Sequence, residues 1–530
     1  MLRALILCCL VAAPSGAETR ALMEESFEVA QQGMASAAGA ALRQIGQRAA
    51  LGDDALAVVL RERQALAGRM QGVEAALTTD GADRTELGGE VDQMALELRV
   101  LDARIVKEFP RYAELTQPQA LALPEVARLL HKDEALILFF VGNETTWVWA
   151  VSPTQQGWNS IQAGRATMAG FVSTLRASIG PVATARSAAP LEGEASPQAG
   201  FDRGLSYGMY RTLLAPLEPV FAEAKHLYIV PDGPLTSLPF ALLIAGDYPG
   251  GQTRNAAELR GTEWLIKRYA ITTLPSVESL GVVRKMPRPG GDLLAFAGFG
   301  DPVLGGTMQL ASLSRGPGLM RDGVADVDQL MALAPLPQTR AELQGIARSL
   351  GASPETVRLG AMATEAAVKA ADLSKTRVLA FATHGLLSGD LKGLDEPALV
   401  LTPPLMPNRL DDGLLTASEI TDLTLNADWV VLSACNTAGG ETPGAEGLSG
   451  LARAFLFAGA RSILVTHWPV RDDAAARITT DVFARLKDGR ARGKSEALRQ
   501  AMLDLMADKS DPTLADPAAW APFALVGEGA

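Results

Sequence analysis

The hydrophobic pattern of the N-terminal quarter of the chain has helical spacing. Apolar residues recur every three or four positions in Leu56–Leu77 and Thr85–Phe109, and the segment Thr78–Gly81 between them has turn composition. This pattern predicts two or more long amphipathic helices before about residue 128. Two interpretations stay open: the helices pack on the domain that follows, or they form an arm that binds a partner or senses a signal.

The pattern then changes to strand type. Ala135–Val151 contains two β-prone runs around Gly142-Asn143, which predicts a hairpin. Trp147 and Trp149 alternate and would share one face of the sheet. A helix is expected over Gly164–Ser178, and the Ala/Pro/Ser-rich stretch Val182–Gly200 is the best candidate for a linker.

From Phe201 onward, short apolar strands alternate with helical segments. The strands are expected at His226–Val230, Leu293–Ala297, Arg377–Ala382, Trp429–Ser433, Ser462–Trp468 and near Phe523–Val526. Such alternation predicts an α/β fold with a mostly parallel sheet flanked by helices, preceded by the N-terminal helical region. Thr339 with Glu342 and Thr416 with Glu419 have the spacing of capping boxes that open helices.

We therefore predict four regions. They are a signal peptide at 1–17, a helical, coiled-coil-like region at 18–128, a small β-containing subdomain with a linker at 129–200, and an α/β domain at 201–530.

Composition narrows the possible partners. The 530 residues are 48% hydrophobic and carry a net charge of −12, with a pI of about 5.1. The acidic balance gives no indication of binding to nucleic acid or to an anionic membrane. Because no later stretch reaches about 18 consecutive apolar residues, no integral membrane span is expected.

The first residues resemble a bacterial secretory signal. Arg3 precedes the short apolar run Ala4–Ala13, and Ser15-Gly16-Ala17 forms a small-residue site with cleavage expected after Ala17. The protein would then be periplasmic or secreted. The alternative is a cytosolic start with a buried apolar turn.

Removal of that signal would leave one cysteine. Cys8 and Cys9 would be lost with it, and Cys435 is the only cysteine beyond them. A single cysteine in an exported protein indicates intermolecular pairing or a free reactive thiol. Without further context, a buried hydrophobic cysteine would be the simpler interpretation.

The context favours a reactive thiol. His384 and Cys435 each follow a predicted buried strand, at the carboxyl end where active sites of open α/β sheets gather. A thiol with a pKa of about 8.5 is mostly protonated at neutral pH, so it needs a neighbouring base. His384 can take that proton and later protonate the leaving amine. The backbone amides of Gly385 and Cys435 are candidate donors to a tetrahedral oxyanion.

Several linked motifs make the C-terminal half similar to the CHAT domain family, bacterial relatives of the caspase and separase cysteine peptidases. They include ATHG at Ala382–Gly385, DGLLTASEI at Asp412–Ile420, VVLSACNT at Val430–Thr437, EGLSGLARAFLFAGARSIL at Glu446–Leu464, IVPDGPLTSLPFALL at Ile229–Leu243, LPQTRAEL at Leu336–Leu343 and WAPFALVG at Trp520–Gly527. The similarity covers roughly Leu121–Gly527. It implies a caspase-like fold and peptide-bond cleavage by His384 and Cys435.

Three further residues are candidates for the site on less evidence. Asp232, in Pro-Asp-Gly after an early strand, lies where caspase relatives place specificity determinants, or it satisfies its own turn. Glu446 lines the substrate pocket or caps the next helix. His467 stands where an apolar residue is expected and would be structural more often than catalytic. The long tetratricopeptide arrays that the family usually carries upstream are not expected here, because the N-terminal region is too short for them. The family's usual mode of sensing a partner is therefore in doubt for this chain.

The sequence thus predicts an exported cysteine endopeptidase that hydrolyses polypeptides with the His384/Cys435 dyad. No metal or organic cofactor is expected, and a protein activator would act through the N-terminal helices. Two alternatives keep the fold but change the role. One is a non-catalytic interaction or scaffold module, and the other is an acyl transferase that uses the same dyad.

Overall fold

The computed structural model describes most of the chain. The described residues are 20–34, 59, 62, 66, 84–108, 120–179, 200–247, 250–285, 293–306, 320–321, 324–336, 338–386, 394, 396–408, 410–433, 450–468 and 470–529. The predicted signal peptide, the linker core and the loop with Cys435 and Glu446 therefore lie outside the described residues.

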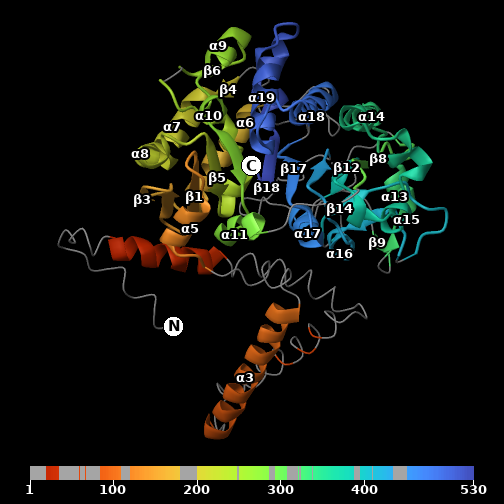
Figure 1. Cartoon of the computed structure of the whole chain (residues 1–530). Helices are drawn as coiled ribbons and strands as arrows, with labels where there is room; N and C mark the ends of the chain where they lie inside the picture. Colours follow the sequence, from red (N-terminus) through yellow and green to blue (C-terminus); the bar gives the residue numbers. More distant parts are fainter. Residues whose placement is uncertain are drawn as a thin grey trace.

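One 11-stranded sheet organises the fold, in the order β11-β8-β12-β16-β17-β18-β7-β5-β1-β2-β3 (Figure 1). Its strands are β1 (Glu134–Val141), β2 (Thr146–Val151), β3 (Gln156–Ile161), β5 (His226–Val230), β7 (Ala270–Thr273), β8 (Ala297–Gly300), β11 (Val357–Leu359), β12 (Val378–Ala382), β16 (Trp429–Leu432), β17 (Ser462–Thr466) and β18 (Phe523–Gly527). The pairs among β11, β8, β12, β16 and β17 are all parallel, as are those among β1, β5 and β7. The predicted mostly parallel α/β sheet is confirmed.

Both faces of the sheet are covered. Ala380 of β12 faces one core and its neighbours Leu379 and Phe381 face another, as the two-residue period of a strand requires. The first face carries α6 (Arg165–Ile179), α7 (Arg203–Leu213), α14 (Gln338–Leu350), α18 (Asp472–Lys487) and α19 (Lys494–Ala507). The second carries α5 (Leu123–Leu129), α11 (Val277–Lys285), α15 (Glu365–Lys369), α16 (Ala417–Thr421) and α17 (Gly450–Ala458). Because both faces are covered, the strands are continuous apolar runs.

Further elements complete the described part. They are α3 (Arg84–Glu108), α8 (Glu218–Phe221), α9 (Ala256–Gly261), α10 (Leu265–Arg268), α13 (Val327–Met331), α20 (Pro517–Trp520), the pair β4 (Phe201–Asp202) and β6 (Gln252–Thr253), the pair β9 (Met320–Arg321) and β10 (Val324–Ala325), and a three-stranded sheet of β13 (Gly385–Leu386), β14 (Ala398–Val400) and β15 (Leu414–Thr416). Among the described residues, no helix combines the length and the apolar character needed to cross a membrane.

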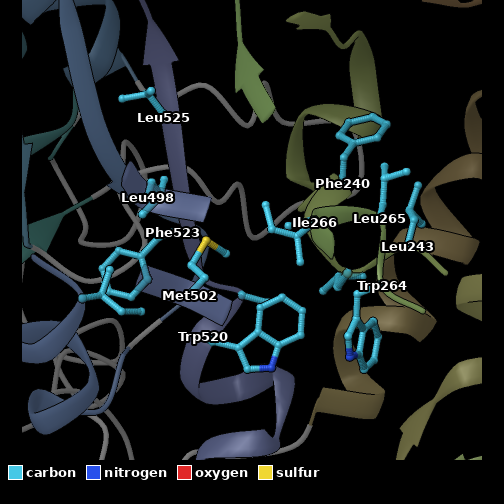
Figure 2. Close-up of a cluster of buried hydrophobic side chains, with 14 of the residues drawn as sticks. Phe240, Leu243, Trp264, Leu265, Ile266, Leu498, Met502, Trp520, Phe523 and Leu525 are labelled. Atoms are coloured by element: carbon cyan, nitrogen blue, oxygen red, sulfur yellow. The ribbon is translucent and has the colours of Figure 1, made fainter. Parts of the chain in front are cut away.

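The two halves of the sheet share a hydrophobic core. Figure 2 shows side chains from the segment around α10, including Trp264 and Ile266, lying toward Met502 and Trp520 of the C-terminal half. The rings of Trp264 and Trp520 meet edge to face with centroids 5.3 Å apart, and both are fully buried. Strands β1–β3, from the predicted segment 129–200, belong to the same sheet as the strands after residue 201, through the parallel β1–β5 pair.

Replacement of Trp520 by alanine is expected to lower the free energy of unfolding by about 3–5 kcal/mol, since it removes a large buried side chain and leaves a cavity beside Trp264. Urea denaturation measures the change. Leu405→Ala is the control, because Leu405 is fully exposed (103%) and its loss should change stability by less than about 0.5 kcal/mol. Equal effects of the two substitutions would contradict the shared core.

Several local predictions are also resolved. The hairpin is confirmed as β1 and β2, with Trp149 buried and Trp147 partly buried in one core. Of the N-terminal helices, residues 20–34 pack on this domain, where Phe27 contacts Trp149 edge to face. Helix α3 lies apart from the sheet in Figure 1, so the partner-binding interpretation stays a prediction for α3.

Candidate active site

The strands that lead to His384 and Cys435 are neighbours. β12 and β16 pair in parallel, with Phe381 opposite Leu432, and the Ser433 N–H donates to Phe381 O (2.9 Å). The two strands therefore end side by side at the same edge of the sheet. His384 lies two residues beyond β12. Ser433 is the last described residue after β16. Cys435 comes two residues later and lies outside the described residues.

The imidazole of His384 is held in one orientation. Its Nε2 lies 2.9 Å from the backbone oxygen of Ala334, and the residue is only 2% exposed. A carbonyl oxygen only accepts hydrogen bonds, so Nε2 carries the proton and donates it. Nδ1 is then the nitrogen that can receive a proton from another group.

Ala334 is a member of the site that sequence reasoning missed. It lies between α13 and α14, and its segment is anchored to the chain after β8 by bonds from Gly305 N to Met331 O (3.1 Å) and from Gly306 N to Leu333 O (3.2 Å). A side chain on Gly306 would overlap the backbone of Ala332. The pair Gly305-Gly306 was the available signal in the sequence, since glycine permits such close approach.

Gly385 begins β13, which pairs with β14. The Val400 N–H donates to His384 O (2.9 Å), and Gly385 lies opposite Leu399. In an antiparallel ladder this makes Gly385 and Leu399 a non-hydrogen-bonded pair. The Gly385 N–H therefore points away from β14, out of the small sheet.

The end of β8 is secured beside β12 in an unexpected way. Asp301 adopts a left-handed backbone conformation (φ 51°) and its N–H donates to Thr339 Oγ1 (3.0 Å). Its carboxylate pairs with Arg340 (2.6 Å). Thr339 was expected to cap α14, but the helix begins at Gln338, so the predicted capping box at Thr339 is wrong. The box formed by Thr416 and Glu419 is confirmed.

His467 follows β17, the strand on the other side of β16. Its side chain is buried, and burial, with a smaller contribution from the nearby Arg176 guanidinium, lowers its pKa to about 3. The ring is therefore neutral at pH 7. Its Nδ1 has no hydrogen-bond partner among the described residues.

Asp232 is not brought to His384. Four strands lie between β12 and β5, so the two strands are about 24 Å apart at ~4.8 Å per step. The carboxylate of Asp232 accepts the Val141 N–H (2.7 Å) and thereby joins the ends of β5 and β1. This bond gives the Asp232 side chain a structural role at the strand ends, and its role in substrate specificity stays a prediction. Glu446, the other predicted specificity residue, lies outside the described residues.

Metal-ligand geometry is also absent from the described part of the chain. No three His, Cys, Asp or Glu side chains among these residues are placed to hold a metal ion.

Comparison with protein families shows the family to which the chain belongs. The family model of the CHAT domain matches residues 205–528, more than half of the chain. The chain belongs to the CHAT domain family. The match begins within α7, later than the resemblance expected from about Leu121, so β1–β3 lie before the matched CHAT domain although they extend its sheet.

Two curated relatives match the CHAT domain chain over similar lengths. Tetratricopeptide repeat protein 28 of Mus musculus is 29% identical over 366 residues, and that of Homo sapiens is 28% identical over 377 residues. These alignments cover 60% and 62% of this chain. The chain spans only 13% of the length of each relative.

Two solved structures align with a large part of the chain at low sequence identity. The Saccharomyces cerevisiae separase–securin complex aligns with 80% of this chain and 31% of that chain, at 9% identity and a TM-score of 0.41. The Arg-specific cysteine proteinase gingipain R aligns with 62% of this chain and 66% of that chain, at 12% identity and a TM-score of 0.34.

Proposed function

We propose that this CHAT domain protein is a cysteine endopeptidase, exported after removal of residues 1–17. The observation that carries the proposal is the placement of His384. His384 follows β12, which pairs with β16, the strand that leads to Cys435. Its Nε2 donates a hydrogen bond to Ala334 O. This arrangement leaves Nδ1 to exchange a proton with a thiol at the same edge of the sheet.

The reaction needs no group outside the chain except water. Nδ1 of His384 takes the thiol proton, and the sulfur of Cys435 attacks the peptide carbonyl carbon. The Gly385 N–H, which points out of its sheet, is a donor for the resulting oxyanion together with the Cys435 amide. His384 then returns the proton to the leaving nitrogen as the C–N bond breaks. Water hydrolyses the thioester, releases the acid and restores the thiol.

The proposal is tested with an electrophilic peptide probe and a set of peptide substrates. The mature protein would contain one cysteine, so every thiol adduct reports on Cys435. Wild-type protein is expected to form the probe adduct and to cleave peptides, whereas Cys435→Ala should do neither. Cys435→Ser serves as the near-isosteric variant and should fold normally without reacting with the probe.

The alternatives predict different results. A scaffold would react with iodoacetamide at the rate of an ordinary thiol and would show no preference for the peptide probe. An acyl transferase would form a Cys435-dependent thioester and pass it to an amine without net hydrolysis. Absence of probe labelling and cleavage, even after limited proteolysis within 437–446, would refute the peptidase proposal.

A further inference from the structure

A single arginine links the N-terminal half of the sheet to the chain that follows β17. Arg176 lies on α6, and its Nη2 donates to His467 O (2.7 Å). Its Nη1 donates to Ser237 O (3.1 Å), at the end of η2 (Gly233–Ser237), the 3₁₀ turn that follows β5. The guanidinium thus joins three segments that are far apart in the sequence.

The residues after β17 are held from several sides. The guanidinium carbon of Arg176 lies 5.9 Å from the ring centroid of Trp468. The indole N–H of Trp468 donates to Ala518 O (3.3 Å), and the His467 N–H donates to Pro522 O (2.8 Å). Trp468 is 8% exposed and His467 5%. Together these contacts leave the backbone at His467 and Trp468 little freedom.

This segment lies beside the candidate active site. β17 pairs in parallel with β16, so its carboxyl end lies at the same edge as those of β16 and β12. One strand spacing, about 5 Å, separates it from the strand that leads to Cys435. The chain at His467–Trp468 therefore flanks the edge of the sheet at which the strand leading to Cys435 ends.

We propose that Arg176 is a positioning residue. From the N-terminal half of the molecule it fixes the chain at His467–Trp468, which forms one wall of the substrate-binding site. The inference rests on the proposed function, because it assumes that a polypeptide binds at this edge. A guanidinium donating to two carbonyl oxygens makes two charge-assisted bonds, which are stronger than neutral ones. It sets the wall without contacting the reacting atoms, so it should affect substrate binding more than chemistry.

Three variants test this role. Arg176→Ala removes both bonds, and Arg176→Lys keeps the charge but cannot reproduce the planar fork. Arg260→Ala is the matched control. Arg260 also donates to two backbone oxygens, Met506 O (3.0 Å) and Asp508 O (2.8 Å), at the C-terminal end of α19.

For peptide cleavage, Arg176→Ala is expected to raise KM about tenfold or more with kcat within about threefold, because the charge-assisted bond that holds His467 O is lost. Arg176→Lys should fall between it and wild type, and Arg260→Ala should leave KM within about twofold. Alkylation of Cys435 by iodoacetamide should be unchanged in all three, because the wall does not act on the thiol.

A second readout does not depend on activity. Amide hydrogen exchange across 466–471 should be at least tenfold faster in Arg176→Ala than in wild type, and unchanged in Arg260→Ala. If wild type cleaves nothing, the proposed function fails while the exchange result still decides whether Arg176 holds this segment. Unchanged exchange, or faster exchange with unchanged KM in an active enzyme, would overturn the positioning role.

Discussion

Replacement of His384 by alanine should slow peptide cleavage by about 10²–10⁴-fold, the usual contribution of a positioned general acid–base. The thiol would lose the group that takes its proton. The residual rate should then rise with pH toward the ordinary thiol pKa of about 8.5, because only spontaneously ionised thiolate would react. Steady-state cleavage measured between pH 5 and 9 gives both quantities.

His384→Gln separates proton transfer from packing. The glutamine Nε2 amide can donate to Ala334 O from about the place of the imidazole Nε2, but it cannot take a proton at neutral pH. It should therefore be as slow as His384→Ala while unfolding closer to wild type. His131→Gln is the control, since the His131 side chain is 63% exposed and lies far along the chain from the site. Activity retained by His384→Gln would mean that His384 only supports the fold.

The element types of the C-terminal half could be predicted because local patterns specify them. β12, β16 and β17 are apolar runs bounded by polar or small residues, and both dyad residues stand just after such runs. The adjacency of β12 and β16 is not specified by these runs and comes from strand pairing in the folded sheet. β8 was misplaced, because glycine weakens a strand signal. In the structure, Gly298 and Gly300 allow Leu343 of α14 to pack closely on this strand.

The remaining features of the site come from long-range contacts that leave no local pattern. The acceptor for His384 is the main-chain oxygen of Ala334, and a backbone carbonyl has no residue identity to recognise. Arg176 and His467 are 291 positions apart. Asp232 was predicted as a specificity determinant from the family resemblance, and its distance from β12 depends on the strand order, which packing of the whole sheet decides.

Glu134 makes the stability at the start of β1 depend on pH. Its carboxylate, 4% exposed, accepts from Arg284 Nη2 (2.5 Å) and from the His131 N–H (2.8 Å). Burial alone would raise its pKa, but hydrogen bonds from His226, His131 and Arg284 lower the pKa from 4.5 to about 2. This difference corresponds to about 3 kcal/mol of stability when the carboxylate is ionised.

The sign of the effect follows from proton binding. Between pH 4.5 and about 2, the unfolded chain binds a proton at Glu134 that the folded protein does not, so acid favours unfolding. Glu134→Gln should therefore cost about 3 kcal/mol at pH 7, with a smaller difference from wild type at pH 3. Urea unfolding at pH 7, 5 and 3 measures this difference.

Glu258→Gln is the matched control for Glu134→Gln. Glu258 also meets an arginine at 2.5 Å, the side chain of Arg203, but Glu258 is 49% exposed. Solvent screens such a pair, so the substitution should change stability by less than about 1 kcal/mol. A Glu134→Gln difference that stays constant from pH 7 to pH 3 would mean that the carboxylate is not held ionised by its buried partners. The stabilisation at the start of β1 would then come from packing alone.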